Sequence, residues 1–407
     1  ENFGGIKFIE FEFKPINILI GPQASGKSVT VKLSYFFKTF FSEIFRSITN
    51  NETKRQLDSR QKDRFYNYFP KESWPKGSFK IKYQLNNTSI YVTKSGDSSL
   101  HFDYSVDLKK IINKGRSFYK EEEKKLKLEP RMSSYKLSRN TRTRFNECLK
   151  SEISSIAAYN QFFVPAGRSF FANIQSSIFS FLSENRSLDP FLIEFGSFYE
   201  SFKRYSLDVR NEKLKKNDAL ISEILNGDYL REKEKDFLVH RDSRKVNLSN
   251  ASSGQQETLP LVLVLNTIAS IGFAEGGATL YIEEPEAHLF PTAQKRIVQL
   301  LARTFNTIDS NFQIIVTTHS PYILSSFNNL IEAGKIIEEH PQSSTKVHKI
   351  VQKEEVIKPA DLIAYSVNKG EKMVLIDKET KLISQNILDS VSDEISLEFG
   401  KLLDIEF

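Results

Sequence analysis

Apolar and polar positions along this chain predict a core in which strands and helices alternate. The apolar run Ile16–Ile20 has the length of a buried strand, and the apolar spacing after it predicts a helix from Lys27 to about Ser47. Strands that alternate with helices pair in parallel and bind ligands at their carboxyl ends, so we expect an α/β fold with a mixed or parallel core sheet. The same pattern returns later and predicts helices over 254–271 and 291–305 and from Pro321, and strands over Thr279–Ile282 and Phe312–Val316.

Other segments predict additions to this core. Alternation of apolar and polar residues in Ile6–Phe13 predicts a further strand before Ile16. An Asn86-Asn87 turn between two alternating stretches predicts an antiparallel β subdomain, which a basic helical segment follows. The expected organisation is a core in residues 1–50 and 160–407 with C-terminal edge elements, an insertion at 51–159 that holds the β subdomain and the basic helices, and a helical and hairpin insertion at 189–248.

Composition narrows the class of protein. The 407 residues are 39% hydrophobic and the mean hydropathy is −0.38, which is typical of a globular protein. Apolar runs stay well short of the roughly 20 residues that span a bilayer, so we expect no membrane partner. The single cysteine, Cys148, excludes an intrachain disulfide and favours a reducing, cytoplasmic location.

Positive charge is concentrated in one segment. Residues 105–151 hold 14 Lys and Arg against 6 Asp and Glu, an excess of 8 that is larger than the net charge of +6 on the whole chain. A basic helical segment fits contact with DNA, contact with an acidic partner, or a solvated face without a partner. Composition alone leaves these three interpretations open.

The most specific chemical motif follows the first buried strand. Residues 21–28 read Gly-Pro-Gln-Ala-Ser-Gly-Lys-Ser, the G-x-x-x-x-G-K-[ST] pattern of a phosphate-binding loop between a strand and a helix. Glycines let the backbone curl so that N–H groups point at phosphate oxygens, and the helix N-terminus adds positive potential. We expect Lys27 to reach the β- and γ-phosphates and Ser28 to place its hydroxyl on Mg²⁺. The nucleotide-binding residues predicted in this region are Gly21, Ser25, Gly26, Lys27, Ser28 and Val29.

Two adjacent carboxylates follow the strand predicted at Thr279–Ile282. One carboxylate at the end of a buried strand can hold Mg²⁺ while the next orients or deprotonates the attacking water. By position, Glu283 is the predicted metal ligand and Glu284 the predicted catalytic base. The alternative is a solvated Glu-rich turn without chemistry, and the phosphate-binding loop upstream favours the catalytic interpretation. The expected ligands are therefore ATP and Mg²⁺.

Two weaker motifs lie on either side of these carboxylates. Ser252-Ser253-Gly254-Gln255-Gln256 precedes a predicted helix, and Ser253 with Gln256 fits a capping box. A capped helix start also carries free N–H groups, which the γ-phosphate of a nucleotide on a second subunit can use. His319 follows a hydrophobic strand, where a lone histidine is most often structural, but its position one βα unit after Glu284 also suits a γ-phosphate sensor.

The order of these motifs resembles that of ABC-type ATPases. Gly21–Ser28, Ser252–Gln256, Ile282–Pro285 and Thr318–Ser320 take the places of the Walker A, signature, Walker B and switch-histidine motifs. The sequence of residues 283–291, Glu-Glu-Pro-Glu-Ala-His-Leu-Phe-Pro, is similar to that of OLD-like and SMC-like ATPases from bacterial antiphage defence systems such as Septu, PARIS and Gabija. The run Phe-Val-Pro-Ala-Gly-Arg-Ser at 163–169 is similar too. The resemblance covers roughly residues 1–50 and 160–330.

This resemblance implies a P-loop ATPase head that forms a homodimer or a higher even-numbered homo-oligomer. Two ATP molecules would lie between Walker A of one subunit and residues Ser252, Ser253, Gly254 and Gln255 of the other. Glu284 would act as catalytic base, His319 as the switch, and Gln161 as the Q-loop residue that contacts nucleotide and Mg²⁺. Glu283 stands where many ABC proteins have Asp, which predicts slow ATP turnover.

The resemblance also implies a function. We expect an ATP-binding and hydrolysing subunit of a bacterial antiphage defence complex that scaffolds or controls a separate effector nuclease of HNH or TOPRIM type. The segment after Ser320 lacks an Asp-x-Asp cluster behind a strand, so no fused TOPRIM nuclease is expected. The alternative is an SMC or DNA-repair ATPase that binds DNA directly through residues 105–151, although long coiled-coil arms are missing. A transporter subunit is disfavoured by the long insertions.

Overall fold

A six-stranded sheet forms the centre of the protein. The computed structural model describes residues 1–407 except 97, 129–132, 174–187, 207–216, 234, 272–275, 309–310, 385–394 and 404–407. The strand order is β12-β11-β1-β10-β9-β5, and every neighbouring pair is parallel except β11 with β12, so the sheet is mixed as predicted. Its strands are β1 (Ile16–Ile20), β5 (Asn160–Val164), β9 (Ala278–Glu283), β10 (Phe312–Thr318), β11 (Leu362–Asn368) and β12 (Glu371–Val374).

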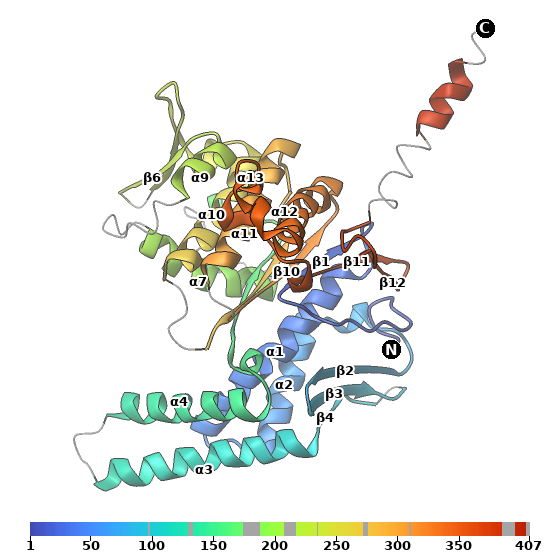
Figure 1. Ribbon diagram of the computed structural model, residues 1–407. Helices are drawn as coiled ribbons and strands as arrows, with labels where there is room; N and C mark the ends of the chain where they lie inside the picture. Colours follow the sequence, from blue (N-terminus) through green and yellow to red (C-terminus); the bar gives the residue numbers. More distant parts are fainter. Residues whose placement is uncertain are drawn as a thin grey trace.

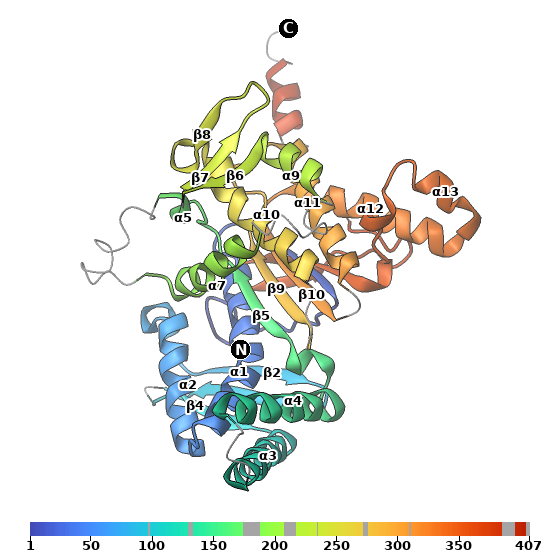
Figure 2. The same cartoon turned by 90° about the vertical axis from the view of Figure 1, so that its left-hand side faces the viewer.

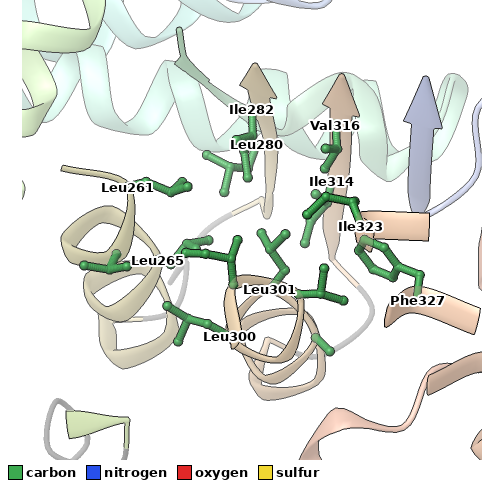
Figure 3. Close-up of a cluster of buried hydrophobic side chains, with 14 of the residues drawn as sticks. Leu261, Leu265, Leu280, Ile282, Leu300, Leu301, Ile314, Val316, Ile323 and Phe327 are labelled. Carbon is green, nitrogen blue, oxygen red and sulfur yellow. The ribbon is translucent and has the colours of Figure 1, made fainter. Parts of the chain in front are cut away.

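Alternate residues of the core strands bury two hydrophobic clusters on opposite faces of the sheet, because successive side chains of a strand point to opposite sides. On one face, Ile18 of β1 belongs to a cluster that α10, α11 and α12 complete. Figure 3 shows Leu280 of β9 and Val316 of β10 in this cluster. Leu19 of β1 points to the other face. The helices of the first face are α7 (Pro190–Ser206), α9 (Asp218–Leu225), α10 (Ser253–Ile271), α11 (Pro291–Thr307), α12 (Pro321–Glu339) and α13 (Ser344–Val347).

The helix predicted after the glycine-rich loop, α1 (Lys27–Thr49), covers the second face. Its phenylalanines pack on a small antiparallel sheet of order β2-β3-β4; Phe40, for example, stacks on Tyr104 with ring centroids 5.2 Å apart. The predicted β subdomain and the Asn86-Asn87 turn are therefore present. Its elements are α2 (Lys54–Tyr68), β2 (Phe79–Leu85), β3 (Thr88–Lys94) and β4 (His101–Tyr104).

The basic segment forms a helical hairpin. Its two helices, α3 (Val106–Leu128) and α4 (Ser134–Glu152), lie side by side and project from the body next to the β2-β3-β4 sheet (Figures 1 and 2). The opposite end of the molecule carries the second insertion, which includes the three-stranded antiparallel sheet β6 (Asp228–Glu232), β7 (Lys235–Val239) and β8 (Lys245–Asn247) instead of a two-stranded hairpin. None of the described helices is long and apolar enough to cross a bilayer.

One expectation about the edges of the core is wrong. Residues 6–13 form no strand, because side chains rather than a ladder of backbone bonds fix them: Phe11 packs edge-on against Tyr365 at 5.2 Å, and the Tyr365 hydroxyl donates to the Glu12 carbonyl at 2.9 Å. Of the C-terminal strands, β12 lies at the edge of the sheet, whereas β11 is an inner strand that pairs with β1 on one side and β12 on the other. The core sheet therefore continues beyond β1 through β11 and β12, which come from the C-terminal quarter of the chain.

Candidate functional site

Parallel register places the predicted motifs along one edge of the core sheet. Ile20 of β1 lies opposite Thr318 of β10, whose neighbour Thr317 lies opposite Glu283 of β9. Ile282 lies in turn opposite Val164, the last residue of β5. The glycine-rich loop, the carboxylates, His319 and the turn after β5 therefore leave the sheet at neighbouring points. This is the ligand-binding edge expected for a parallel α/β sheet.

Lys27 closes the glycine-rich loop. Its Nζ donates to the carbonyls of Gly21 and Pro22, each at 2.8 Å, and lies 3.4 Å from Ser25 Oγ. Burial lowers the pKa of Lys27, while the charges of Glu284 and Glu286 raise it. The ammonium group is thus held inside the loop and within the field of the carboxylates that follow β9.

The backbone of this loop requires glycine at two positions. A Cβ on Gly21 would lie 2.0 Å from the Val367 carbonyl oxygen of β11. Gly26 has φ +101° and forms the N-cap of α1 without a side-chain cap, so the first N–H groups of the helix are left for a ligand. Ser28 is exposed in this first turn, and Val29 is half-buried.

Glu283 has an unsatisfied carboxylate oxygen in the interior. Its Oε2 accepts a long hydrogen bond of 3.4 Å from Ala166 N, whereas Oε1 is buried and has no partner within the described part of the chain. The hydroxyl of Thr317, on the neighbouring strand, is also buried and has no hydrogen-bond partner among the described residues. Buried oxygens of this kind suit a hard cation, so Glu283 and the exposed Ser28 hydroxyl fit Mg²⁺. The described residues hold no group of three His, Cys, Asp or Glu side chains placed to bind a metal.

Glu284 and His319 face each other across the ends of β9 and β10. The His319 Nε2 lies 3.4 Å from Glu284 Oε1, and the Glu284 side chain is 40% exposed. Glu284 has φ +45°, a left-handed conformation that is uncommon for a residue other than glycine and that occurs at functional sites. Glu286 holds the backbone of His319, whose N–H donates to Glu286 Oε1 at 2.6 Å. A partly exposed carboxylate beside an imidazole can accept a proton from water.

The Ser252–Gln256 segment caps α10, one residue earlier than predicted. Ser252, not Ser253, is the capping residue, because its Oγ accepts from Gln255 N at 3.3 Å while Gln255 Oε1 accepts from Ser252 N at 3.2 Å. A Cβ on Gly254 would lie 2.6 Å from the His288 carbonyl oxygen, so this glycine packs against the loop that follows β9. The Ser252 and Ser253 side chains are exposed.

The structure does not bring Gln161 to this edge, which corrects its assignment as a Q-loop residue. Gln161 pairs in register with Thr279 near the start of β9, three residues and about 10 Å along the strand from Val164. Its amide is also occupied, since Nε2 donates to the Tyr159 carbonyl at 2.8 Å and Oε1 accepts from the Tyr281 hydroxyl at 3.0 Å. We therefore assign it no contact with nucleotide or metal.

Arg168 and Glu257 are part of this edge, although sequence reasoning gave them no role. Arg168 is fully buried and donates to the carbonyls of Glu283 at 2.7 Å and Glu284 at 3.0 Å. Glu257 lies in the first turns of α10 and pairs with Arg168 at 3.3 Å. The signal available in the sequence was a charged residue in each of two otherwise uncharged segments.

The fold and this edge define a P-loop α/β protein. Residues 16–325 match the family model described as "AAA domain, putative AbiEii toxin, Type IV TA system". The match covers more than half of the chain, which therefore belongs to this AAA family.

Two curated relatives are similar over short stretches. "Retron Ec83 probable ATPase" of Escherichia coli is 29% identical over 100 residues, which are 23% of this chain and 18% of that protein. "Retron Vc95 probable ATPase" of Vibrio cholerae serotype O1 biovar El Tor is 28% identical over 146 residues, which are 34% of this chain and 24% of that protein. The matches span about a quarter or less of the length of these relatives.

Solved SMC heads are similar at low sequence identity. The SMC head domain from Thermotoga maritima is 12% identical with a TM-score of 0.36, and the match covers 92% of this chain and 95% of that chain. The Pyrococcus furiosus Smc head with an extended coiled coil, bound to the C-terminal domain of ScpA, is 12% identical with a TM-score of 0.40, over 97% of this chain and 98% of that chain.

Proposed function

We propose that this chain binds and hydrolyses ATP at the edge formed by the ends of β1, β9 and β10. The proposal rests mainly on the strand register, which places the loop closed by Lys27 beside two carboxylates. Glu283 is buried and has an oxygen without a partner among the described residues, and Glu284 is exposed next to His319. Membership of an AAA family supports it, because this family is one of nucleotide-binding domains.

Each residue of the site then has a defined task. The N–H groups at the start of α1 and the Lys27 ammonium bind the β- and γ-phosphates, for which Lys27 exchanges its carbonyl partners. Ser28 and Glu283 would hold Mg²⁺, which neutralises charge on the phosphate oxygens when it is bound. Glu284 accepts the proton of the attacking water, and His319 orients the Glu284 carboxylate.

We propose further that the site is completed by a second copy of the chain. Ser252 and Ser253 are exposed at the start of α10, where N–H groups and the helix dipole favour an anion. Within one chain, Gly254 packs against the loop after β9 rather than against the Gly21–Ser28 loop. The phosphates on one subunit would then meet α10 of the other, which gives a homodimer or a higher even-numbered oligomer.

The names of the relatives support a role in defence. Two retron ATPases and the toxin family of the matching model are similar to this chain. We therefore propose that it is the ATPase subunit of a bacterial antiphage defence complex and that ATP controls a separate effector nuclease of HNH or TOPRIM type.

Direct contact with DNA is a second candidate, which the α3–α4 hairpin favours. Lys120, Lys124 and Lys127 are exposed on one side of α3 at helical spacing and take part in none of the ion pairs found among the hairpin's described residues. A projecting row of cations can contact the phosphates of a duplex.

The Lys27→Ala variant tests the proposed site. We expect it to lose ATP binding, since it deletes a charge-assisted contact worth roughly 1.5–3 kcal/mol and opens the loop that Lys27 closes. Equilibrium binding of a fluorescent ATP analogue measures the effect, with Lys295→Ala, an exposed lysine of α11, as the control. Equal affinity in wild type and Lys27→Ala would refute the assignment of the loop.

A further inference from the structure

We propose that Arg168 and Glu257 couple the start of α10 to the backbone that carries Glu284, which makes Arg168 a positioning residue for ATP hydrolysis. The proposal rests on the function proposed above and adds a connection between its two halves: the end of α10 that would meet the partner's nucleotide, and the base that acts on the chain's own nucleotide.

The Arg168 guanidinium donates hydrogen bonds to backbone carbonyls from three segments of the chain. Its Nη1 donates to Pro165 O at 2.8 Å and to Glu283 O at 2.7 Å, and its Nη2 donates to Glu284 O at 3.0 Å. Its Nε donates to Glu257 O at 2.9 Å. The side chain is fully buried, so each donor must find an acceptor inside the protein. The successive carbonyls of Glu283 and Glu284 are thus fixed by one planar group.

Glu257 fixes Arg168 in return. Its Oε1 accepts from Arg168 N at 2.9 Å and lies 3.3 Å from Nη2, while its Oε2 accepts from Ser169 N at 2.8 Å. Glu257 is also buried, and it stands one turn after Ser253 and Gly254 in α10. A shift of this helix start therefore moves the carboxylate and the carbonyl on which Arg168 depends.

The geometry gives this pair a task beyond stability. Glu284 has the left-handed conformation described above, and such a conformation persists only where neighbouring groups hold it. Arg168 holds it through the Glu284 carbonyl, and the Thr317 carbonyl holds it through the Glu284 N–H at 2.9 Å. When α10 engages a phosphate, Arg168 transmits the position of the helix to the Glu284 backbone.

The test compares Arg168→Lys and Glu257→Gln with a matched control. Lysine keeps the charge but cannot reach several acceptors in one plane, and glutamine keeps the shape but loses the charge. We expect kcat for ATP to fall by about 10²-fold in both variants, because a small displacement of a catalytic group has an effect of this size, while ATP affinity stays within about 2-fold. Arg168→Lys added to Glu284→Gln should lower kcat no further.

The control is a second buried pair outside this edge, Lys203 with Asp236 at 2.9 Å. Lys203→Met should lower the melting temperature and leave kcat of the folded protein unchanged. If Arg168→Lys and Glu257→Gln lower kcat no more than Lys203→Met does, or if ATP affinity falls in step with kcat, the proposal is wrong. A wild-type protein that binds ATP but does not hydrolyse it would instead refute the proposed function, and this inference with it.

Discussion

Lys38 shows what burial does to a single residue of this protein. It lies on α1, almost inaccessible to solvent, and its Nζ donates to the Gln313 side chain. Burial lowers its pKa from the ordinary 10.5 to about 7. Between these two pH values the unfolded chain binds more protons than the folded one. Lys38 therefore destabilises the folded state most below about pH 7, and this destabilisation decreases as the pH rises.

A pH series tests this account. We expect the unfolding free energy of wild type, relative to Lys38→Met, to rise by up to about 1.4 kcal/mol per pH unit between pH 7.5 and 9.5. Urea denaturation at each pH measures both proteins. Parallel stability curves for wild type and Lys38→Met would mean that Lys38 keeps an ordinary pKa in the folded state.

Single residues also show which parts of the site can be predicted from the sequence and which cannot. The loop at 21–28 and the carboxylates Glu283 and Glu284 are local patterns whose position at strand ends follows from periodicity. Arg168 and Glu257 stand 89 residues apart, and their pairing depends on packing that no local pattern encodes. Gln161 could have been excluded, because it stands at the beginning of a strand whose ligand-binding end comes after Val164.

At the scale of elements, the alternation of strands and helices predicted most of the core. The strands β1, β9 and β10 are buried along their whole length because both faces of the sheet are covered, and their largely apolar runs are easily recognised. The segment before β1 alternates like a strand, but the Glu12 carbonyl in it accepts a hydrogen bond from the Tyr365 hydroxyl and not from the backbone of a neighbouring strand. The place of β11 beside β1 is a long-range pairing that spacing cannot reveal.

The α3–α4 hairpin makes a prediction as an element. If it contacts DNA, binding should weaken steeply with salt, and Lys120, Lys124 and Lys127 changed together to Gln should flatten the slope by about 1 per lysine that contacts a phosphate. Fluorescence anisotropy of labelled duplex DNA at several salt concentrations measures the slope. The control changes three exposed lysines elsewhere, Lys346, Lys349 and Lys353, to Gln. DNA affinity that is absent or independent of salt would exclude this contact.

Across the whole molecule, one edge of the core sheet collects residues from both ends of the chain. The glycine-rich loop and β1 come from the first 30 residues, whereas Glu284 and His319 come from the last third, and parallel pairing with β10 joins them. The α3–α4 hairpin and the β6-β7-β8 sheet lie at opposite ends of the body (Figure 1). The arrangement places the α3–α4 hairpin at the far end of α1 from the glycine-rich loop, since Gly115 of α3 packs against Ile48.

The most direct test is phosphate release by wild type and by Glu284→Gln at saturating ATP and Mg²⁺. We expect slow but measurable turnover by wild type and a loss of about 10²–10⁴-fold in Glu284→Gln, with ATP affinity unchanged, because glutamine keeps the shape of the side chain and cannot take the proton. Wild-type turnover in Glu284→Gln would refute the role of Glu284 and place the catalytic base on another residue.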